Sequence, residues 1–223
     1  MTVPISLSRA HFPITTLGPG ARIGIWFQGC SIRCPGCISV DTWAADGPAT
    51  TVEAVLGLAA GWAPEADGVT ISGGEPFDQP EALLALLVGL RPRLAGTADV
   101  LVFSGHSYPK IRPILDAAAG LIDAIITDPF LLEAPQTLAL RGSDNQRLHA
   151  LTALGERRLR PFERTRTADD DRLDLMADEH GTFWMAGIPR RGDLERLREI
   201  LAAEGALVRT SEHRAAVRAS DGR

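Results

Sequence analysis

The sequence has few cysteines, and their distribution does not suit a disulfide framework. There are three in 223 residues, an odd number, and all lie within eight positions of one another. Bridges therefore cannot be their main purpose. In a reducing compartment, clustered thiols more often hold a metal or do redox chemistry than form a structural disulfide. A disulfide-stabilised secreted scaffold is excluded, and the cysteines point to chemistry.

Long apolar runs and an excess of positive charge are also missing. The longest apolar stretch, Ala82 to Leu90, has roughly half the length of a membrane span. The N-terminus lacks the basic and apolar segments of an export signal, which predicts a cytoplasmic protein without a membrane partner. The formal net charge of −5 leaves no basic stripe to collect phosphates, so nucleic acid is not an expected partner.

The rest of the composition is that of a folded domain. Apolar residues make up 45% and charged residues 23%, and no tract is of low complexity. A chain of this length can form one sizeable domain, alone or with a small appendage.

Short apolar runs alternate with helical patterns in the first part of the chain. The spacing of branched residues predicts buried parallel strands at 23–27, 69–71, 100–103 and 122–126. Two capping boxes predict helices between them, Thr50 with Glu53 and Asp78 with Glu81. This alternation predicts a parallel α/β sheet. A complete eightfold barrel takes about 250 residues, which leaves an incomplete, laterally open barrel or a flat doubly wound sheet.

The chain changes character after residue 156. Arginines followed by Asp169–Asp171 predict a solvated linker over 157–171. Two apolar runs around a Glu179–Gly181 turn predict a hairpin, and a helix is expected from Asp193 to Gly205. We therefore divide the chain into a main domain (1–156), the linker, a ββα appendage (172–210) and a frayed tail (211–223).

The three thiols lie in one loop directly after the first predicted strand. Cys30, Cys34 and Cys37 have spacings of three and two intervening residues. A closed zinc site needs a fourth protein ligand, which one of the five histidines would have to provide. Ferredoxin-type clusters likewise normally use four thiolates. Three cysteines suggest a 4Fe–4S cluster with one iron open to an outside ligand, and three simply buried thiols remain the plainer alternative.

A second motif, Gly73-Gly74-Glu75-Pro76, follows the next predicted strand. Paired glycines allow a ligand to approach the backbone, and the Glu75 carboxylate can accept hydrogen bonds from an ammonium group. Taken alone, the motif is more simply a turn before the helix that Asp78 would cap. Because ligands bind at the carboxyl ends of parallel strands, we expect the two motifs to form one site.

Together the two motifs resemble the radical S-adenosylmethionine enzymes. The resemblance implies that Cys30, Cys34 and Cys37 hold a 4Fe–4S cluster and that S-adenosylmethionine binds its open iron through the methionine amino and carboxylate groups. It implies that Gly73, Gly74, Glu75 and Pro76 receive the methionine amino group. The remaining candidates for cofactor contacts are Gly36 and Ile38 against the adenine, and Ser104 and Asp128 for the ribose or methionine.

Further residues narrow the resemblance. Trp26–Cys30, Trp43 and Arg141–Arg147 are similar to the activating proteins of anaerobic ribonucleotide reductase, over roughly residues 10–155. This implies an incomplete (β/α) barrel, an oxidoreductase that forms a glycyl radical on a partner enzyme, and flavodoxin or ferredoxin as electron donor. The alternatives are radical modification of another protein, peptide or small molecule, a ferredoxin-like electron carrier, and a zinc-stabilised binding module.

Four further side chains carry weaker expectations. His106 follows a predicted strand end, where an exposed loop histidine is favoured over a group in the pocket. Ser143 is as consistent with the N-cap of a helix as with a direct functional role. Trp26 and Trp43 favour ordinary core packing over shielding of a cluster.

Overall fold

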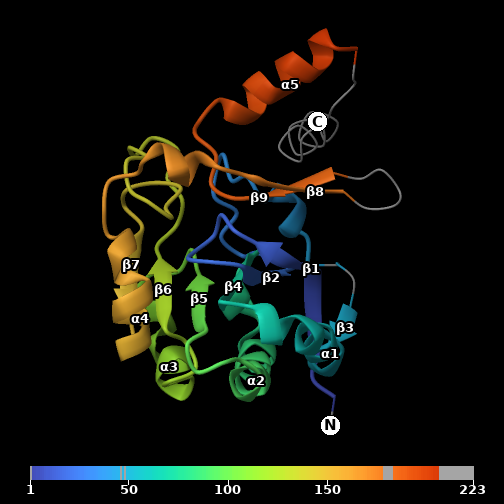
Figure 1. Cartoon of the computed structure of the whole chain (residues 1–223), viewed down its shortest axis with the longest axis vertical. Helices are drawn as coiled ribbons and strands as arrows, with labels where there is room; N and C mark the ends of the chain where they lie inside the picture. Colours follow the sequence, from blue (N-terminus) through green and yellow to red (C-terminus); the bar gives the residue numbers. More distant parts are fainter. Residues whose placement is uncertain (1, 46, 48, 178–182, 206–223) are drawn as a thin grey trace.

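The fold is built on a seven-stranded mixed sheet with the order β3-β1-β2-β4-β5-β6-β7 (Figure 1). The computed structural model describes residues 2–45, 47, 49–177 and 183–205. The four central strands are parallel: β2 (Arg22–Phe27), β4 (Gly68–Gly73), β5 (Asp99–Phe103) and β6 (Ala124–Thr127). Three strands are antiparallel to their neighbours: β1 (Pro4–Ile14), β3 (Ala49–Thr51) and β7 (Arg147–Ala150). Within the described residues β3 and β7 form the two edges, so the sheet does not close.

The predicted α/β class and its four parallel strands are confirmed. All residues of β2 and β6 are buried, as expected for strands covered on both faces. The register places Phe27 opposite Gly73 and Phe103 opposite Ile126. The carboxyl ends of these strands therefore meet at one edge of the sheet, which is where the two sequence motifs follow them.

Three helices cover one face of the sheet: α1 (Val52–Trp62), α2 (Pro80–Leu90) and α3 (Tyr108–Ala117). Their apolar sides form the main core with alternate residues of the strands, such as Ile25 and Val102. Helix α1 is capped by Thr51, whose Oγ1 accepts a hydrogen bond of 3.2 Å from Ala54 N. The prediction of Thr50 as the cap was wrong by one residue, because Thr50 pairs with Ile5 in β3 and β1.

Three strands, β1, β3 and β7, were missed from the sequence. Prolines at positions 4 and 13 argue against a strand, but β1 has β3 as a partner only at Pro4–Ser6, and an edge strand tolerates proline. The helix considered after Ser143 is not formed: residues 147–150 form β7, and Ser143 is buried. Its Oγ accepts a hydrogen bond from Leu131 N at 3.1 Å, so the hydroxyl holds a loop.

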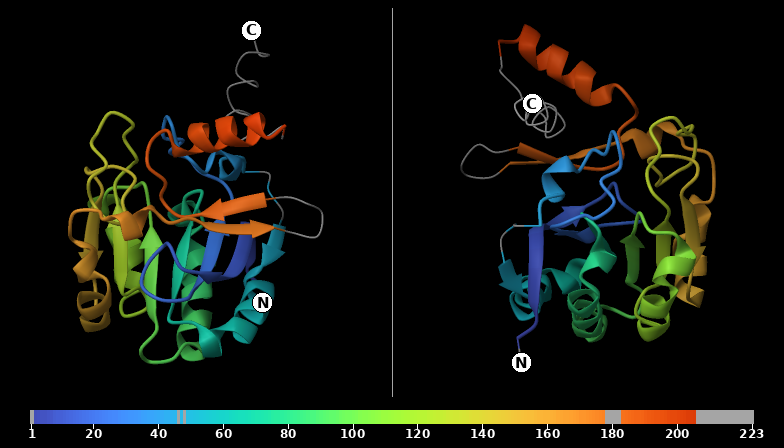
Figure 2. Two further views of the ribbon diagram at one scale, coloured as in Figure 1. Left: turned by 45° about the horizontal axis from the view of Figure 1, so that its top comes forward. Right: turned by 180° about the vertical axis from the view of Figure 1, so that it is seen from behind.

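The second face of the sheet is covered by the C-terminal part of the chain. Leu101 and Ile126 pack there against Leu148 and Leu159, next to α4 (Ala153–Arg158). The predicted hairpin is confirmed as β8 (Asp174–Ala177) and β9 (Phe183–Ala186), and Figure 2 shows it lying across β1 and β2. Helix α5 (Asp193–Ala203) follows it. The turn at 179–181 and the tail at 211–223 lie outside the described residues.

The segment 157–171 is folded onto the sheet. It contains two short 3₁₀ helices, Arg160–Phe162 and Ala168–Asp171, and Arg164 pairs with Asp170. Leu159 has no exposed surface. Most of the segment is exposed or half-buried, as expected of a solvated linker, but Leu159 and Phe162 pack into the core on the second face.

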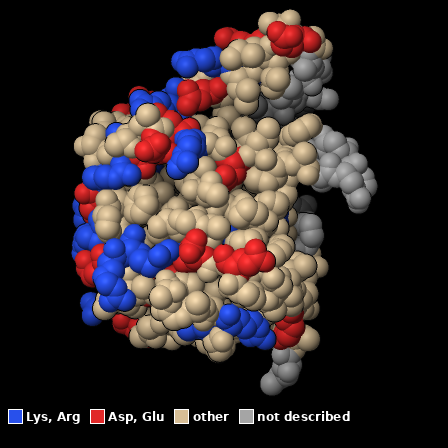
Figure 3. All heavy atoms as spheres, viewed as in Figure 1, with Lys and Arg blue, Asp and Glu red and all other residues tan. Residues whose placement is uncertain are grey.

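None of the described helices is long and apolar enough to cross a membrane. On part of the face seen in Figure 3, Lys and Arg side chains lie among Asp and Glu side chains. The rest of that face is a broad area without charged side chains.

If residues 157–171 complete the core, truncating Leu159 must destabilise the whole domain. We expect Leu159→Ala to lower the free energy of unfolding by about 2–5 kcal/mol, since the buried side chain leaves a cavity. Leu175→Ala, at a position that is 66% exposed, is the matched control and should change it by no more than about 0.5 kcal/mol. Urea unfolding measures both, and equal effects would contradict the packing.

Candidate functional site

The three cysteines lie in a loop, residues 29–43, that is closed at its base by hydrogen bonds. Gly29 N donates to Thr42 O at 2.8 Å, and Cys30 N donates to Trp43 O at 3.3 Å. The buried Gln28 side chain donates to Asp41 O and Ala44 O. We call this segment the cysteine loop. Its base continues directly from β2, so the sheet fixes where the loop begins.

All three cysteines are free and half-buried. Burial raises the pKa of Cys34 and of Cys37. Phe130 backbone and the Trp43 indole, which lie beside Cys34 and Cys37 respectively, act in the opposite sense and favour the thiolates. Trp43 Nε1 is buried without a hydrogen-bond partner. An indole N–H next to a sulfur suits an additional acceptor there.

Within the part of the chain that the structure describes, no three His, Cys, Asp or Glu side chains converge on one metal ion. A structural zinc site requires such convergence of four ligands. In an iron–sulfur cubane each thiolate binds a different iron, so the sulfurs need not meet at one point. Three thiols on one loop, each able to bind its own iron, fit such a cluster.

The motif Gly73–Pro76, which we call the glycine segment, lies directly against the base of the cysteine loop. Gly74 N donates to Phe27 O and Glu75 N donates to Gly29 O, both at 2.8 Å. A Cβ atom at Gly74 would lie 2.0 Å from Gly29 O, and one at Gly73 would lie 2.5 Å from Phe27 N. Gly73 also has a φ of 104°, which favours glycine. The paired glycines are thus required by a close approach of two backbones.

Glu75 is 1% exposed and joins the ends of two strands. Its Oε1 accepts hydrogen bonds from Phe77 N at 3.0 Å and Ser104 Oγ at 2.9 Å, and its Oε2 accepts one from Gly105 N at 2.8 Å. Burial raises the pKa of Glu75, and these three donors oppose the rise. A carboxylate has about four acceptor positions, so about one is left for a ligand. Ser104 is buried and directed at Glu75.

Two of the remaining predicted contacts, Gly36 and Asp128, involve a loop that we call the covering loop, residues 128–132. Leu132 packs so close to Gly36 that a Cβ there would lie 3.0 Å from its Cδ1. Ile38 is 38% exposed. Asp128 is half-buried with a φ of 80°, and its carboxylate accepts a hydrogen bond from Thr127 Oγ1. The Asp128 carboxylate is therefore bonded to its neighbour in the chain, and Asp128 belongs to the site as the first residue of the covering loop.

The Arg141–Arg147 motif braces the covering loop. Asn145 Nδ2 donates to Pro129 O at 2.8 Å, and Gln146 Nε2 donates to Asp128 O at 3.3 Å. Together with the bond from Leu131 N to Ser143 Oγ, these contacts hold the loop at several carbonyl and amide groups. The motif positions the loop that covers Cys34 and Gly36.

Comparison with known proteins agrees with this arrangement. Residues 16–149 match a family described as a 4Fe-4S single cluster domain. The anaerobic ribonucleoside-triphosphate reductase-activating protein of Enterobacteria phage T4 is 30% identical over 138 residues, which cover 60% of this chain and 87% of that protein. This chain belongs to the glycyl-radical-enzyme activases. The corresponding protein of Escherichia coli K12 is 25% identical over 149 residues (63% and 96% of the two chains), and the pyruvate formate-lyase-activating enzyme of Clostridium pasteurianum is 38% identical over 103 residues (44% and 42%).

The resemblance to radical S-adenosylmethionine activases is therefore confirmed, and the activase is an enzyme of that type. The family match ends at residue 149. Helix α4, the hairpin of β8 and β9, and helix α5 come after it.

Sequence reasoning misjudged two side chains next to the cysteine loop of the activase. Asp78 was expected to cap α2, but that helix follows Gln79 and has no side-chain cap. The Asp78 carboxylate instead accepts hydrogen bonds from Ser31 N at 2.7 Å and Ser31 Oγ at 2.9 Å. His106, favoured as an exposed histidine, is only 9% exposed and lies 3.3 Å from Asp78. No signal in the sequence joins these positions, because they come from three different loops.

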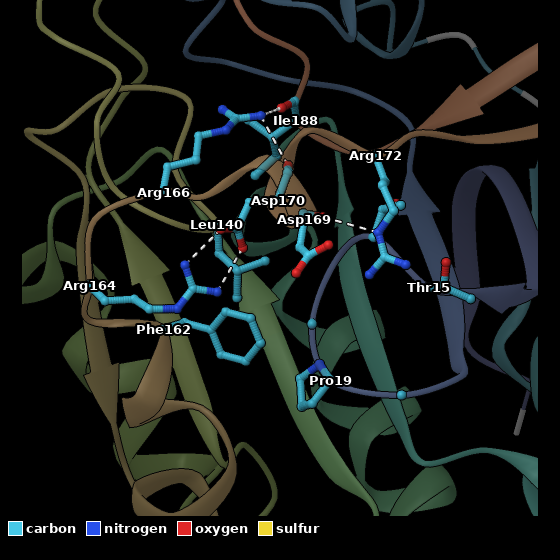
Figure 4. Close-up of a pocket in the computed structure, with 13 residues that line it drawn as sticks. Thr15, Pro19, Leu140, Phe162, Arg164, Arg166, Asp169, Asp170, Arg172 and Ile188 are labelled. Carbon is cyan, nitrogen blue, oxygen red and sulfur yellow. Dashed lines mark hydrogen bonds and ion pairs between the residues drawn. The ribbon is translucent and has the colours of Figure 1, made fainter.

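A cavity of about 260 Å³ lies on the second face of the sheet (Figure 4). Charged side chains line much of it, and most pair with one another: Arg164 binds Asp170, and Arg166 donates to the carbonyls of Asp170 and Ile188. Its described lining includes no residue of the cysteine loop or the glycine segment. The cavity is therefore separate from the candidate site of the activase.

The contact between Gly74 and Gly29 can be tested by adding one methyl group. Gly74→Ala forces the glycine segment away from the cysteine loop, and we expect a loss of about 1–3 kcal/mol in the free energy of unfolding together with reduced iron uptake. Gly57→Ala on α1, where nothing lies within 4 Å of the added Cβ, should instead raise stability by about 0.5–1 kcal/mol. Urea unfolding and iron analysis check both, and unchanged behaviour of Gly74→Ala would contradict the contact.

Proposed function

We propose that the activase holds a 4Fe–4S cluster on Cys30, Cys34 and Cys37 and uses it to cleave S-adenosylmethionine. The three thiols are free, half-buried and on one loop, which suits a cluster with one iron left for an outside ligand. The partnerless Trp43 Nε1 beside Cys37 supports this, since a cluster sulfur would give it an acceptor.

One observation carries the proposal. The backbone of Gly73–Glu75 is hydrogen-bonded to Phe27 and Gly29, immediately before Cys30. A ligand on the open iron would therefore lie next to the glycine segment. We assign Gly73, Gly74, Glu75 and Pro76 to the methionine amino group, with Ser104 acting through Glu75. Gly36, Ile38 and Asp128 complete the proposed S-adenosylmethionine site.

When bound and reduced, the cluster supplies one electron that breaks the sulfonium C–S bond and gives methionine and a 5′-deoxyadenosyl radical. The protein has to orient the cofactor and exclude water. Glu75 retains about one acceptor position for an ammonium group. The covering loop packs Leu132 on Gly36 and the Phe130 backbone on Cys34, so it contacts the cysteine loop on that side.

We further propose that the radical removes a hydrogen atom from a glycine of a partner protein, giving 5′-deoxyadenosine and a glycyl radical. The relatives named for anaerobic ribonucleoside-triphosphate reductase support this class of partner. We interpret the open sheet as an incomplete radical-enzyme barrel and propose that a loop of the partner protein enters at its open side. Ile38 of the cysteine loop and Leu131 and Leu132 of the covering loop are exposed apolar residues. Flavodoxin or ferredoxin is the proposed electron donor.

The cleavage reaction is tested by anaerobic reconstitution with iron and sulfide, reduction, and quantification of 5′-deoxyadenosine. The parent protein and Glu53→Ala, an exposed change on α1, should form it, whereas Cys34→Ala should lose more than about 99% of the product because one iron loses its ligand. A stable cluster without cleavage would favour an electron carrier. A colourless protein with stoichiometric zinc would favour a binding module.

The partner is tested by mixing the reduced, loaded activase with the anaerobic ribonucleotide reductase of the same organism. We expect an electron paramagnetic resonance doublet from a glycyl radical and one 5′-deoxyadenosine for each radical formed. Replacement of the radical glycine of the reductase by alanine should abolish the doublet. Cleavage of S-adenosylmethionine without a radical on the reductase would redirect the search to another protein or peptide.

A further inference from the structure

A row of polar side chains leads from helix α3 to the start of the cysteine loop. Lys110 Nζ lies 3.0 Å from His106 Nδ1, and His106 Nε2 lies 3.3 Å from Asp78 Oδ1. The Asp78 carboxylate accepts both hydrogen bonds of Ser31, the residue directly after Cys30. The three side chains therefore connect the ammonium group of Lys110 on α3 with the backbone of Ser31, which follows the proposed cluster ligand Cys30.

The chemistry of these groups fixes the direction of their hydrogen bonds. An ammonium group can only donate, so His106 Nδ1 accepts from Lys110. The ring proton is then on Nε2, which donates to Asp78. Lys110 is the only lysine of the chain. Its compact ammonium suits a single ring nitrogen, whereas the planar fork of arginine suits a carboxylate.

The row is held firmly from the other side as well. His106 N donates to Ser104 Oγ at 3.1 Å, and the same hydroxyl donates to Glu75. His106 O accepts a hydrogen bond from Asp128 N at 3.0 Å. The His106 ring is thus placed by the same strand ends that place the glycine segment.

We propose that Asp78, His106 and Lys110 are positioning residues that hold the cysteine loop at Ser31 and set the reduction potential of the cluster. The inference rests on the proposed cluster at Cys30, Cys34 and Cys37. The potential of such a cluster depends on nearby charge, hydrogen bonding and solvent exposure. A carboxylate next to Cys30 disfavours an added electron, and the ammonium behind His106 offsets that effect.

This arrangement predicts shifts of opposite sign. Asp78→Asn removes a negative charge and should raise the cluster's reduction potential, while Lys110→Met removes a positive charge and should lower it. For each variant we expect a change of about threefold to tenfold in the reduction equilibrium, tenfold being about 59 mV for one electron. Lys110→Arg keeps the charge and should lie closer to the parent than Lys110→Met.

The matched controls lie on the same helix. Asp116→Asn and Arg112→Met make the same two charge changes at an ion pair whose side chains are 72% and 70% exposed, and solvent should screen their effect on the potential. The measurement is a redox titration of the reconstituted cluster followed by electron paramagnetic resonance, with iron content determined for each variant.

Opposite shifts larger than those of the controls would support the proposed role of Asp78, His106 and Lys110. If Asp78→Asn loses its iron, a lowered potential in Lys110→Met still supports it, because loss of the anchor at Ser31 is then the larger effect. Shifts of the same sign, or a Lys110→Met potential equal to that of Arg112→Met, would overturn it. A parent protein that takes up no iron would instead overturn the proposed cluster, and with it the proposed role of the three side chains.

Discussion

The site depends on the close approach of two backbone segments at the carboxyl edge of the sheet. The parallel register of β2 and β4 brings Phe27 opposite Gly73, and the two chains stay together for two more residues through hydrogen bonds from Gly74 and Glu75. Only residues without a side chain fit this contact, because a Cβ at Gly74 would overlap Gly29 O. Since Cys30 follows Gly29, the same contact determines the position of the first cysteine.

Buried polar groups extend this contact to the neighbouring strands. Glu75 receives donors from Ser104 and Gly105 at the end of β5, and His106 receives the backbone of Asp128 after β6. Each strand end is thereby fixed to the next by a group that would be costly to leave unpaired. The covering loop belongs to this network because Asn145 and Gln146 satisfy its carbonyl groups. The result is a hydrogen-bonded edge of the sheet that holds the base of the cysteine loop.

The sequence was sufficient for the parallel strands and the two motifs, and insufficient for the contacts between loops. An apolar run such as Ile23–Phe27 predicts a strand covered on both faces, and in the structure all of its residues are buried. Side chains such as Asp78 and His106 were misjudged because local rules offered them a simpler place, a helix cap or a wet loop. Their actual partners lie 47 and 28 positions away in the sequence. The antiparallel strands β1, β3 and β7 were missed for a related reason: the prolines of β1 and the polar residues of β3 and β7 are acceptable where a strand segment has a partner on one side only.

The part of the chain beyond the family match is joined to the same edge. Gln136 Nε2 donates to Pro189 O at 2.9 Å, and Arg191 donates to the carbonyls of Leu131 and Ala134. The segment that leads into α5 is therefore bonded to the covering loop and its continuation, while β8 and β9 pack on Ile14 and Trp26. Burial of Trp26 beneath this hairpin places it in the core and away from a role in shielding the cysteines. Because the covering loop contacts Cys34 and Gly36, these side-chain hydrogen bonds connect the C-terminal segment to the cysteine loop.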